Sequence, residues 1–283
     1  MGLILHRICS WGWTSGSLST MSGRTFVIGD IHGDLAALSR LMGLLPEMDA
    51  EDTVVFLGDY IDRGPRSAEV VHYIRQILPE ERSAKIVCLR GNHEDAWLRV
   101  VDRGWDAFVI PAVNGCLACL RSFTGGLVPS EGERPSDDAE IKALFSGSFF
   151  PPDILNWMRE LPFWYEDDHA IYVHAGLPQN ADGAFLHPSK VLNRRKLLWL
   201  RDQEFFRDYR GKTVVFGHTV TSTLPEDLSS YTPEDPTDLW AGEAVIGIDT
   251  GAGKGGFLTC IEFPGMVVWE SRTPEQREAD RQG

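Results

Sequence analysis

The sequence predicts an α/β domain, because segments typical of strands alternate with segments typical of helices. Six short apolar stretches rich in β-branched residues each stop at a glycine or a polar residue, which is the pattern of buried strands. Between the first three stretches, apolar residues recur at helical spacing over 34–45 and 67–78, and Pro46 and Pro79 are expected to end those helices. The chain should therefore begin with a βαβαβ unit. The predicted strands are 25–28, 53–57, 85–89, 170–173, 213–216 and 244–248.

The other segments are assigned from their turn residues and their polarity. Residues 106–140 are rich in glycine, proline and charged residues and show little periodicity, so we expect a loop or cap insertion near the functional site. A helix is predicted over 152–160, and a second long polar loop over 221–238. The run 257–271 is typical of a β-hairpin with a Pro-Gly turn.

The length of 283 residues favours one domain, which we place at 24–271. We expect a disordered extension over 1–23 and a disordered, charged tail over 272–283. No apolar run approaches the ~18 residues of a membrane span, and the first twenty residues lack the long apolar region of a signal peptide. These features predict a monomeric, cytoplasmic protein with no membrane partner.

Charge and cysteine content exclude some classes of protein. The formal net charge of −14 argues against a nucleic-acid partner, because neutralising phosphates requires clustered Lys and Arg. Five cysteines are an odd number in a chain that does not need disulfides, which favours a reducing compartment. Cys116 and Cys119 have redox or zinc spacing, but there is no second pair, so we interpret them as structural thiols.

Six short motifs carry the chemistry, and each follows a predicted strand. Their acidic, amide and imidazole side chains should therefore meet at the C-terminal ends of the strands. Such ligands suit two closely spaced divalent ions such as Mn²⁺, Fe²⁺ or Zn²⁺, which predicts a metal-dependent hydrolase. The motifs are GDIHGD at 29–34, GDYIDRG at 58–64, GNHE at 91–94, HAG at 174–176, GHT at 217–219 and IDTG at 248–251.

In order and content these motifs resemble those of the PPP family of calcineurin-like metallophosphoesterases, the serine/threonine phosphatases, over residues 24–270. The resemblance implies a β-sandwich flanked by helices, in αββα layers, with a dimetal site at the strand ends. It also implies that the cofactors are two divalent metal ions, for which we expect Mn²⁺, with Fe or Zn as alternatives. By this resemblance the first ion is held by Asp30, His32 and Asp59, and the second by Asp59, Asn92, His174 and His218.

The same resemblance implies roles in catalysis and in phosphate binding. His93 matches the general acid that protonates the leaving group, and Asp62 matches the partner that orients its imidazole. Arg63, Arg201 and Asn92 are expected to bind the substrate phosphate, the arginines through their planar donor forks. Arg90 has either a structural role or a phosphate contact. IDTG is interpreted as structural support, and the glycine-rich 250–256 as a turn between strands rather than a phosphate loop.

The main functional hypothesis is a bacterial-type protein phosphatase that hydrolyses phosphoserine and phosphothreonine, and also phosphotyrosine, in a phosphoprotein or phosphopeptide. The alternative is a symmetrical diadenosine tetraphosphate hydrolase of the same superfamily. Enzymes of that kind tend to carry GNHD and to lack the Asp-Arg pair, whereas this chain has Glu94, Asp62 and Arg63. A third hypothesis is a phospho-binding protein without activity, which would normally have lost a ligand or the acid.

Overall fold

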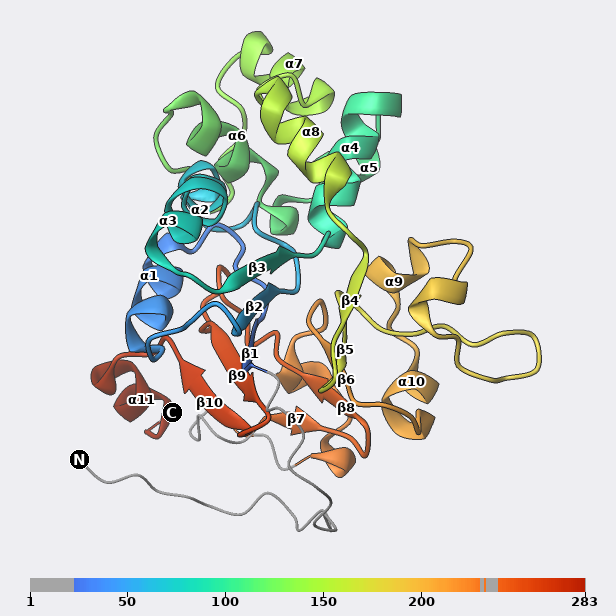
Figure 1. The fold of residues 1–283 in the computed structure, drawn as a ribbon. Helices are drawn as coiled ribbons and strands as arrows, with labels where there is room; N and C mark the ends of the chain where they lie inside the picture. Colours follow the sequence, from blue (N-terminus) through green and yellow to red (C-terminus); the bar gives the residue numbers. More distant parts are fainter. Residues whose placement is uncertain (1–22, 230–231, 233–238, 283) are drawn as a thin grey trace, which may run out of the picture.

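The structure is a computed structural model that describes residues 23–229, 232 and 239–282. Within this part of the chain, two five-stranded sheets form a sandwich with helices on both outer sides (Figure 1). The extension predicted over 1–23 lies outside the described residues except for Gly23, and so does most of the loop predicted beyond residue 229.

The first sheet has the order β10-β9-β1-β2-β3. The strands β1, β2 and β3 are parallel, and β9 pairs antiparallel with both β1 and β10. The connections between the parallel strands are α1 (Leu35–Leu44) and a continuous helical run of α2 (Ser67–His72), the π-helical η1 (Tyr73–Ile77) and α3 (Leu78–Glu81). The predicted βαβαβ unit is thus confirmed. The strands are β1 (Thr25–Ile28), β2 (Thr53–Phe56), β3 (Lys85–Cys88), β9 (Thr259–Phe263) and β10 (Val267–Glu270).

The helix predicted to stop at Pro79 continues past it to Glu81. Pro79 lies directly after the π-helical η1, where the regular i to i−4 hydrogen-bond pattern is already interrupted, so its missing backbone N–H costs less than in a regular helix. Proline is therefore a weaker stop signal here than the sequence rule implies.

The second sheet has the order β4-β5-β6-β8-β7, and its three central strands are parallel. The helices α9 (Lys196–Trp199) and α10 (Gln203–Asp208) cover its outer face, where Leu197 and Phe206 pack against Val214 and Phe216. The edge strands β4 and β7 were not predicted. The strands are β4 (Trp164–Glu166), β5 (Ile171–Val173), β6 (Val214–Phe216), β7 (Trp240–Ala241) and β8 (Val245–Gly247).

Successive side chains along each strand point to opposite faces of the sheet and so pack in different layers. In β1, Phe26 and Ile28 pack on the helix side, whereas Val27 packs with Tyr172 and Val215 of the other sheet. Burial of both faces explains why these strands read as continuous apolar runs rather than as alternating ones. The predicted αββα layering is therefore confirmed.

The segment expected to be a loop over 106–140 is largely helical. It forms α5 (Asp106–Val109), the 3-10 turn η2 (Ala112–Asn114), α6 (Cys116–Thr124) and the start of α7 (Asp138–Ser146). These helices are too short for a periodic pattern to stand out, and contacts with α2 and α4 support them instead. In Figure 1 they gather with α4 (Asn92–Arg103) and α8 (Pro152–Glu160) beyond the β3 edge of the first sheet, and α8 matches its prediction.

The expectation of a disordered tail over 272–283 is wrong for residues 274–280, which form α11 (Pro274–Asp280). Thr273 and Gln276 form a capping box at its start, and the buried Arg272 bonds to Glu270 and Asp280.

None of the helices in the described ranges has both the length and the apolarity needed to cross a bilayer.

Candidate metal centre

The six predicted metal ligands come together where strands of both sheets end. All six are buried, with no more than 5% of any of them exposed. The loops after β1 and β2 carry three of them, the first turn of α4 carries one, and the loops after β5 and β6 carry one each. The six are Asp30, His32, Asp59, Asn92, His174 and His218.

The backbone at the site is held in a sparsely populated conformation. Of the six non-glycine residues with positive φ in the described ranges, five belong to the motifs. Such residues cost of order 1–3 kcal/mol each and persist only where surrounding contacts enforce them. Neighbouring glycines permit these turns: a Cβ at Gly217 would stand 2.1 Å from a carboxylate oxygen of Asp30. The five are His32, Asp59, Asp62, Arg63 and His218.

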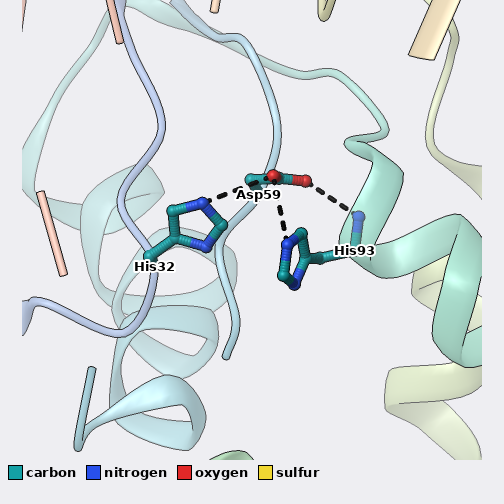
Figure 2. Close-up of side chains that lie close together, drawn as sticks. All are labelled: His32, Asp59 and His93. Carbon is teal, nitrogen blue, oxygen red and sulfur yellow. Dashed lines mark hydrogen bonds and ion pairs between the residues drawn. The ribbon is translucent and has the colours of Figure 1, made fainter. Parts of the chain in front are cut away.

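The imidazole of His32 directs its Nε2 toward the carboxylate of Asp59 (Figure 2), and the same nitrogen also faces the carboxylate of Asp30. Its Nδ1 lies 3.0 Å from the carbonyl oxygen of Ile61, so Nδ1 carries the proton and Nε2 does not. Nε2 in turn lies 3.4 Å from Oδ2 of Asp59 and 3.9 Å from Oδ2 of Asp30. An unprotonated nitrogen facing two carboxylates has no proton to share with them, whereas a cation would bind to all three.

A second group of ligands repeats this arrangement on the other side of Asp59. Nδ1 of His174 lies 3.0 Å from the carbonyl of Leu57, which leaves Nε2 facing Oδ1 of Asn92 at 2.8 Å and Oδ1 of Asp59 at 3.5 Å. Nδ1 of His218 lies 2.7 Å from the same Asn92 oxygen. Asp59 thus offers Oδ2 to one group and Oδ1 to the other, which is the position of a bridging carboxylate.

Burial keeps the three imidazole ligands in the neutral form that binds metal. It lowers the pKa of His32, His174 and His218, so the three imidazoles are neutral at pH 7. Burial also raises the pKa of Asp30 well above its usual value, and the neighbouring carboxylates of Asp249 and Asp59 raise it further. Crowded carboxylates and neutral imidazoles are the donor set that two divalent cations would stabilise.

The predicted general acid, His93, and its predicted partner, Asp62, lie beside the first group. Nδ1 of His93 lies 2.6 Å from Oδ2 of Asp62, and Nε2 of His93 lies 3.9 Å from Oδ2 of Asp59. Trp97, one turn further along α4, donates its indole N–H to both Asp62 oxygens at 2.8 and 2.9 Å. Phe108 of the insertion packs edge-on against both His93 and Trp97. The insertion therefore fixes this pair from outside.

A cavity of about 540 Å³ opens beside the ligands. Arg63, Arg201 and Lys254 line it together with apolar residues of the insertion such as Val113. Nε of Arg201 donates to Nε2 of His218 at 3.0 Å, and the Arg63 guanidinium contacts Nε2 of His32. Nε of Arg63 is buried with no hydrogen-bond partner in the described part of the chain. The cavity is thus cationic where it meets the ligand cluster.

Residues 23–222 match the family model described as calcineurin-like phosphoesterase. The chain belongs to the calcineurin-like phosphoesterase family. It is accordingly a metallophosphoesterase, and this family acts on phosphoric esters with a dinuclear metal centre.

Named relatives of this phosphoesterase fall into two functional groups. A Methylococcus capsulatus protein named symmetrical bis(5'-nucleosyl)-tetraphosphatase is 26% identical over 168 residues, which are 59% of this chain and 48% of the relative. A Caenorhabditis elegans protein named, provisionally, a serine/threonine-protein phosphatase is 43% identical over 68 residues, 24% of this chain and 18% of its own length. The chain therefore spans about half the length of the tetraphosphatase relative and less of the other.

Among solved structures, a metallophosphoesterase from Sphaerobacter thermophilus is similar, with 18% sequence identity and a TM-score of 0.49. The match covers 93% of this phosphoesterase and 94% of the other chain.

Several residues near the centre were given no active role by the motifs. Lys254 belongs to the glycine-rich segment interpreted as a turn, yet it lines the cavity, and its Nζ lies 3.1 Å from the buried Asp249 of IDTG. Glu94 accepts hydrogen bonds from the backbone N–H groups of Asp59, Tyr60 and Gly91 and so fixes the loop after β2. The only sequence signal for a role of Lys254 in the cavity is its position three residues after the IDTG motif.

Arg90 and the two spaced cysteines take no part in this cavity. The Arg90 guanidinium donates to the carbonyl of Arg159 and stacks on Phe163, and Arg90 does not line the cavity of Arg63 and Arg201. Cys116 and Cys119 are buried, unpaired thiols. Burial raises the pKa of both, which keeps them protonated and unreactive.

Proposed function

We propose that this phosphoesterase cleaves a bis(5'-nucleosyl) tetraphosphate symmetrically, giving two nucleoside diphosphates. The observation that carries the proposal is the cavity lined by Arg63, Arg201 and Lys254. A phosphomonoester brings one phosphate to the centre, whereas a polyphosphate chain brings several in a row that three separate cations could bind. The name of the Methylococcus relative supports the same substrate class.

The metal ions would be held by the two ligand groups that share Asp59. Asp30, His32 and Asp59 form one group, and Asn92, His174 and His218 complete the other with Asp59. Two bound ions would supply an acidified water and positive charge at the phosphoryl oxygens. We propose Mn²⁺ in both positions, with iron and zinc as alternatives that the same ligands accept.

The protein's own groups would orient the phosphate and transfer one proton. The Arg63 and Arg201 guanidinium groups would bind non-bridging oxygens of the phosphoryl group under attack. As the bond from phosphorus to the leaving oxygen breaks, that oxygen takes the electron pair, and protonated His93 would donate its Nε2 proton to it. Asp62, 2.6 Å from Nδ1 of His93, would hold the ring in this orientation and stabilise its charged form.

The decisive experiment compares two substrates on the Mn²⁺-loaded protein. We expect kcat/KM to be higher for diadenosine tetraphosphate than for a phosphoserine peptide, and ADP to be the only nucleotide product. Cleavage to AMP and ATP would contradict the symmetrical reaction, and a dominant phosphopeptide activity would contradict the substrate class.

A second candidate, protein phosphatase activity, is supported by the Asp62 and His93 pair. A serine alkoxide is a far stronger base than a diphosphate, so a proton donor matters most when the leaving group is an alkoxide. The Caenorhabditis match, although short, supports this reading. His93→Ala should then reduce turnover of a phosphoserine peptide by about 10²–10⁴-fold and that of the dinucleotide by less.

The exposed His72 provides the control for that experiment, because His72→Ala should change neither activity. If the metal-loaded wild-type protein hydrolyses neither substrate, the chain is a phospho-binding protein without activity. That outcome would exclude both enzymatic candidates.

A further inference from the structure

A second cavity, of about 200 Å³, is lined by arginines and shares no residue with the first. Its lining residues lie on α4 and α8 and in two loops. Arg90 lies between β3 and α4, and Arg195 precedes α9. The motifs give this place no role. Its five arginines are Arg90, Arg99, Arg103, Arg159 and Arg195.

The charge of this arginine cavity is only partly neutralised from within. Asp95 lies 3.1 Å from Nε of Arg195, and Asp102 lies 2.8 Å from Arg159. Asp95 and Asp102 are the acidic residues that line the cavity, so five arginines and two aspartates leave a net charge of +3. A concentration of positive charge is unexpected in a chain with a net charge of −14.

Arg90 provides independent support for a ligand-binding role of the cavity. Its side chain is buried, with 9% of the residue exposed, and its Nε has no hydrogen-bond partner in the described residues. Arg195 and Arg159 place further positive charge near its guanidinium, and Asp95 and Glu94 place negative charge there. A buried donor among like charges is stabilised when an anion accepts from it.

We propose that the arginine cavity binds a small polyvalent phosphate anion at a site distinct from the metal centre. Guanidinium forks match the oxygens of phosphate in pairs, which explains why the cavity is built from arginine. Its volume is below the ~300–1,000 Å³ of pockets that enclose drug-sized ligands, so free phosphate fits better than a nucleotide.

The arginine cavity is connected to the metal centre through two elements. Asn92 and His93 begin α4, and Asp95, Arg99 and Arg103 follow at four-residue spacing on one face of the same helix. Arg195 precedes α9, which leads directly to Arg201. The site does not depend on which substrate the metal centre accepts.

The test is the number of inorganic phosphate ions bound per Mn²⁺-loaded chain, measured by isothermal titration calorimetry. We expect two in the wild-type protein, one at the metal centre and one in the arginine cavity. Arg99→Glu combined with Arg103→Glu should weaken phosphate binding in the arginine cavity by about tenfold or more and leave phosphate binding at the metal centre unchanged. Arg63→Ala should weaken the other site instead.

Two further variants test whether the loss of binding comes from the arginine cavity itself. Arg103→Glu alone changes an exposed residue, so the protein should fold, and it should weaken the same binding event. Arg134→Glu combined with Arg281→Glu reverses two exposed arginines that line neither cavity and should leave both events intact. One phosphate per wild-type chain, or equal loss in both double variants, would overturn the proposal.

Discussion

Gly115 of the insertion lies against the backbone of Arg63, so closely that a Cβ at position 115 would stand 2.1 Å from the Arg63 amide nitrogen. The insertion thus holds the loop that carries Arg63 in place through direct backbone contact. Gly115 also has φ of +70°, which a residue with a Cβ adopts only at a cost.

Gly115→Ala should therefore displace Arg63 as well as destabilise the fold. We expect a loss of about 1–3 kcal/mol in the free energy of unfolding and a higher KM for any phosphate substrate. Urea unfolding and steady-state kinetics measure the two effects. Gly125→Ala is the matched control, because Gly125 has φ of +74° but open space around it. A KM change as large in the control would show that strain alone, and not the Arg63 contact, is responsible.

Replacing the shared carboxylate should remove both metal ions together. Asp59 lies between the two ligand groups, with Oδ2 facing His32 and Oδ1 facing His174. We expect metal analysis to find two ions per wild-type chain, about one in His32→Ala, and close to none in Asp59→Asn. Chelation should abolish wild-type activity, and Mn²⁺ should restore it. A full complement of two ions in Asp59→Asn would disprove the bridging position.

The pH dependence of metal binding should come from Asp30 rather than from the histidines. Burial lowers the pKa of the imidazoles, so no proton has to leave them at pH 7, whereas burial, Asp249 and Asp59 raise the pKa of Asp30. Since metal binds the ionised carboxylate, affinity should rise with pH until Asp30 has lost its proton. Mn²⁺ titrations across pH should give a flatter slope for Asp30→Asn. An unchanged slope in that variant would assign the proton to another ligand.

Loss of the Trp97 indole N–H should weaken the orientation of the acid. Trp97→Phe leaves the buried Asp62 without its 2.8 and 2.9 Å hydrogen bonds, at a cost of about 1–3 kcal/mol. We expect kcat to fall while KM changes little. Trp240→Phe is the control, because Trp240 of the second sheet is also buried but donates to the backbone carbonyl of Pro225. It should lower stability and leave kcat unchanged.

Lys254 should distinguish a polyphosphate substrate from a simple ester. Lys254→Gln is expected to raise KM for diadenosine tetraphosphate about tenfold and KM for p-nitrophenyl phosphate much less. Lys254→Arg keeps the charge beside Asp249 and should retain most of the affinity. An equal effect of Lys254→Gln on both substrates would place Lys254 at the phosphate under attack instead.

The central strands could be predicted because each is a short β-branched run that ends at a motif. The edge strands Trp164–Glu166 and Trp240–Ala241 could not, since two or three residues give no period to read. The helix Cys116–Thr124 is supported by packing against α2 and α7 rather than by a pattern of its own. In contrast, the helix after Thr273 had a readable signal, because Thr273 and Gln276 have capping-box spacing.

The ligands of the candidate centre could be read from the motifs, because each motif places its side chain at a strand end. Gly115 and Trp97 could not, since both act through partners more than thirty residues away in sequence. Nothing local distinguishes Gly115 from Gly125, although a Cβ at the first would clash and one at the second would not.

The left-handed backbone of His32, Asp59, Asp62, Arg63 and His218 has a consequence for engineering this enzyme. Replacement by glycine would relieve backbone strain at these positions, so a selection for the stability of the metal-free chain alone would favour changes there. Each such change removes a group proposed to bind metal, phosphate or the acid. A thermostable variant should therefore be sought in the helices away from the strand ends, with these five positions held constant.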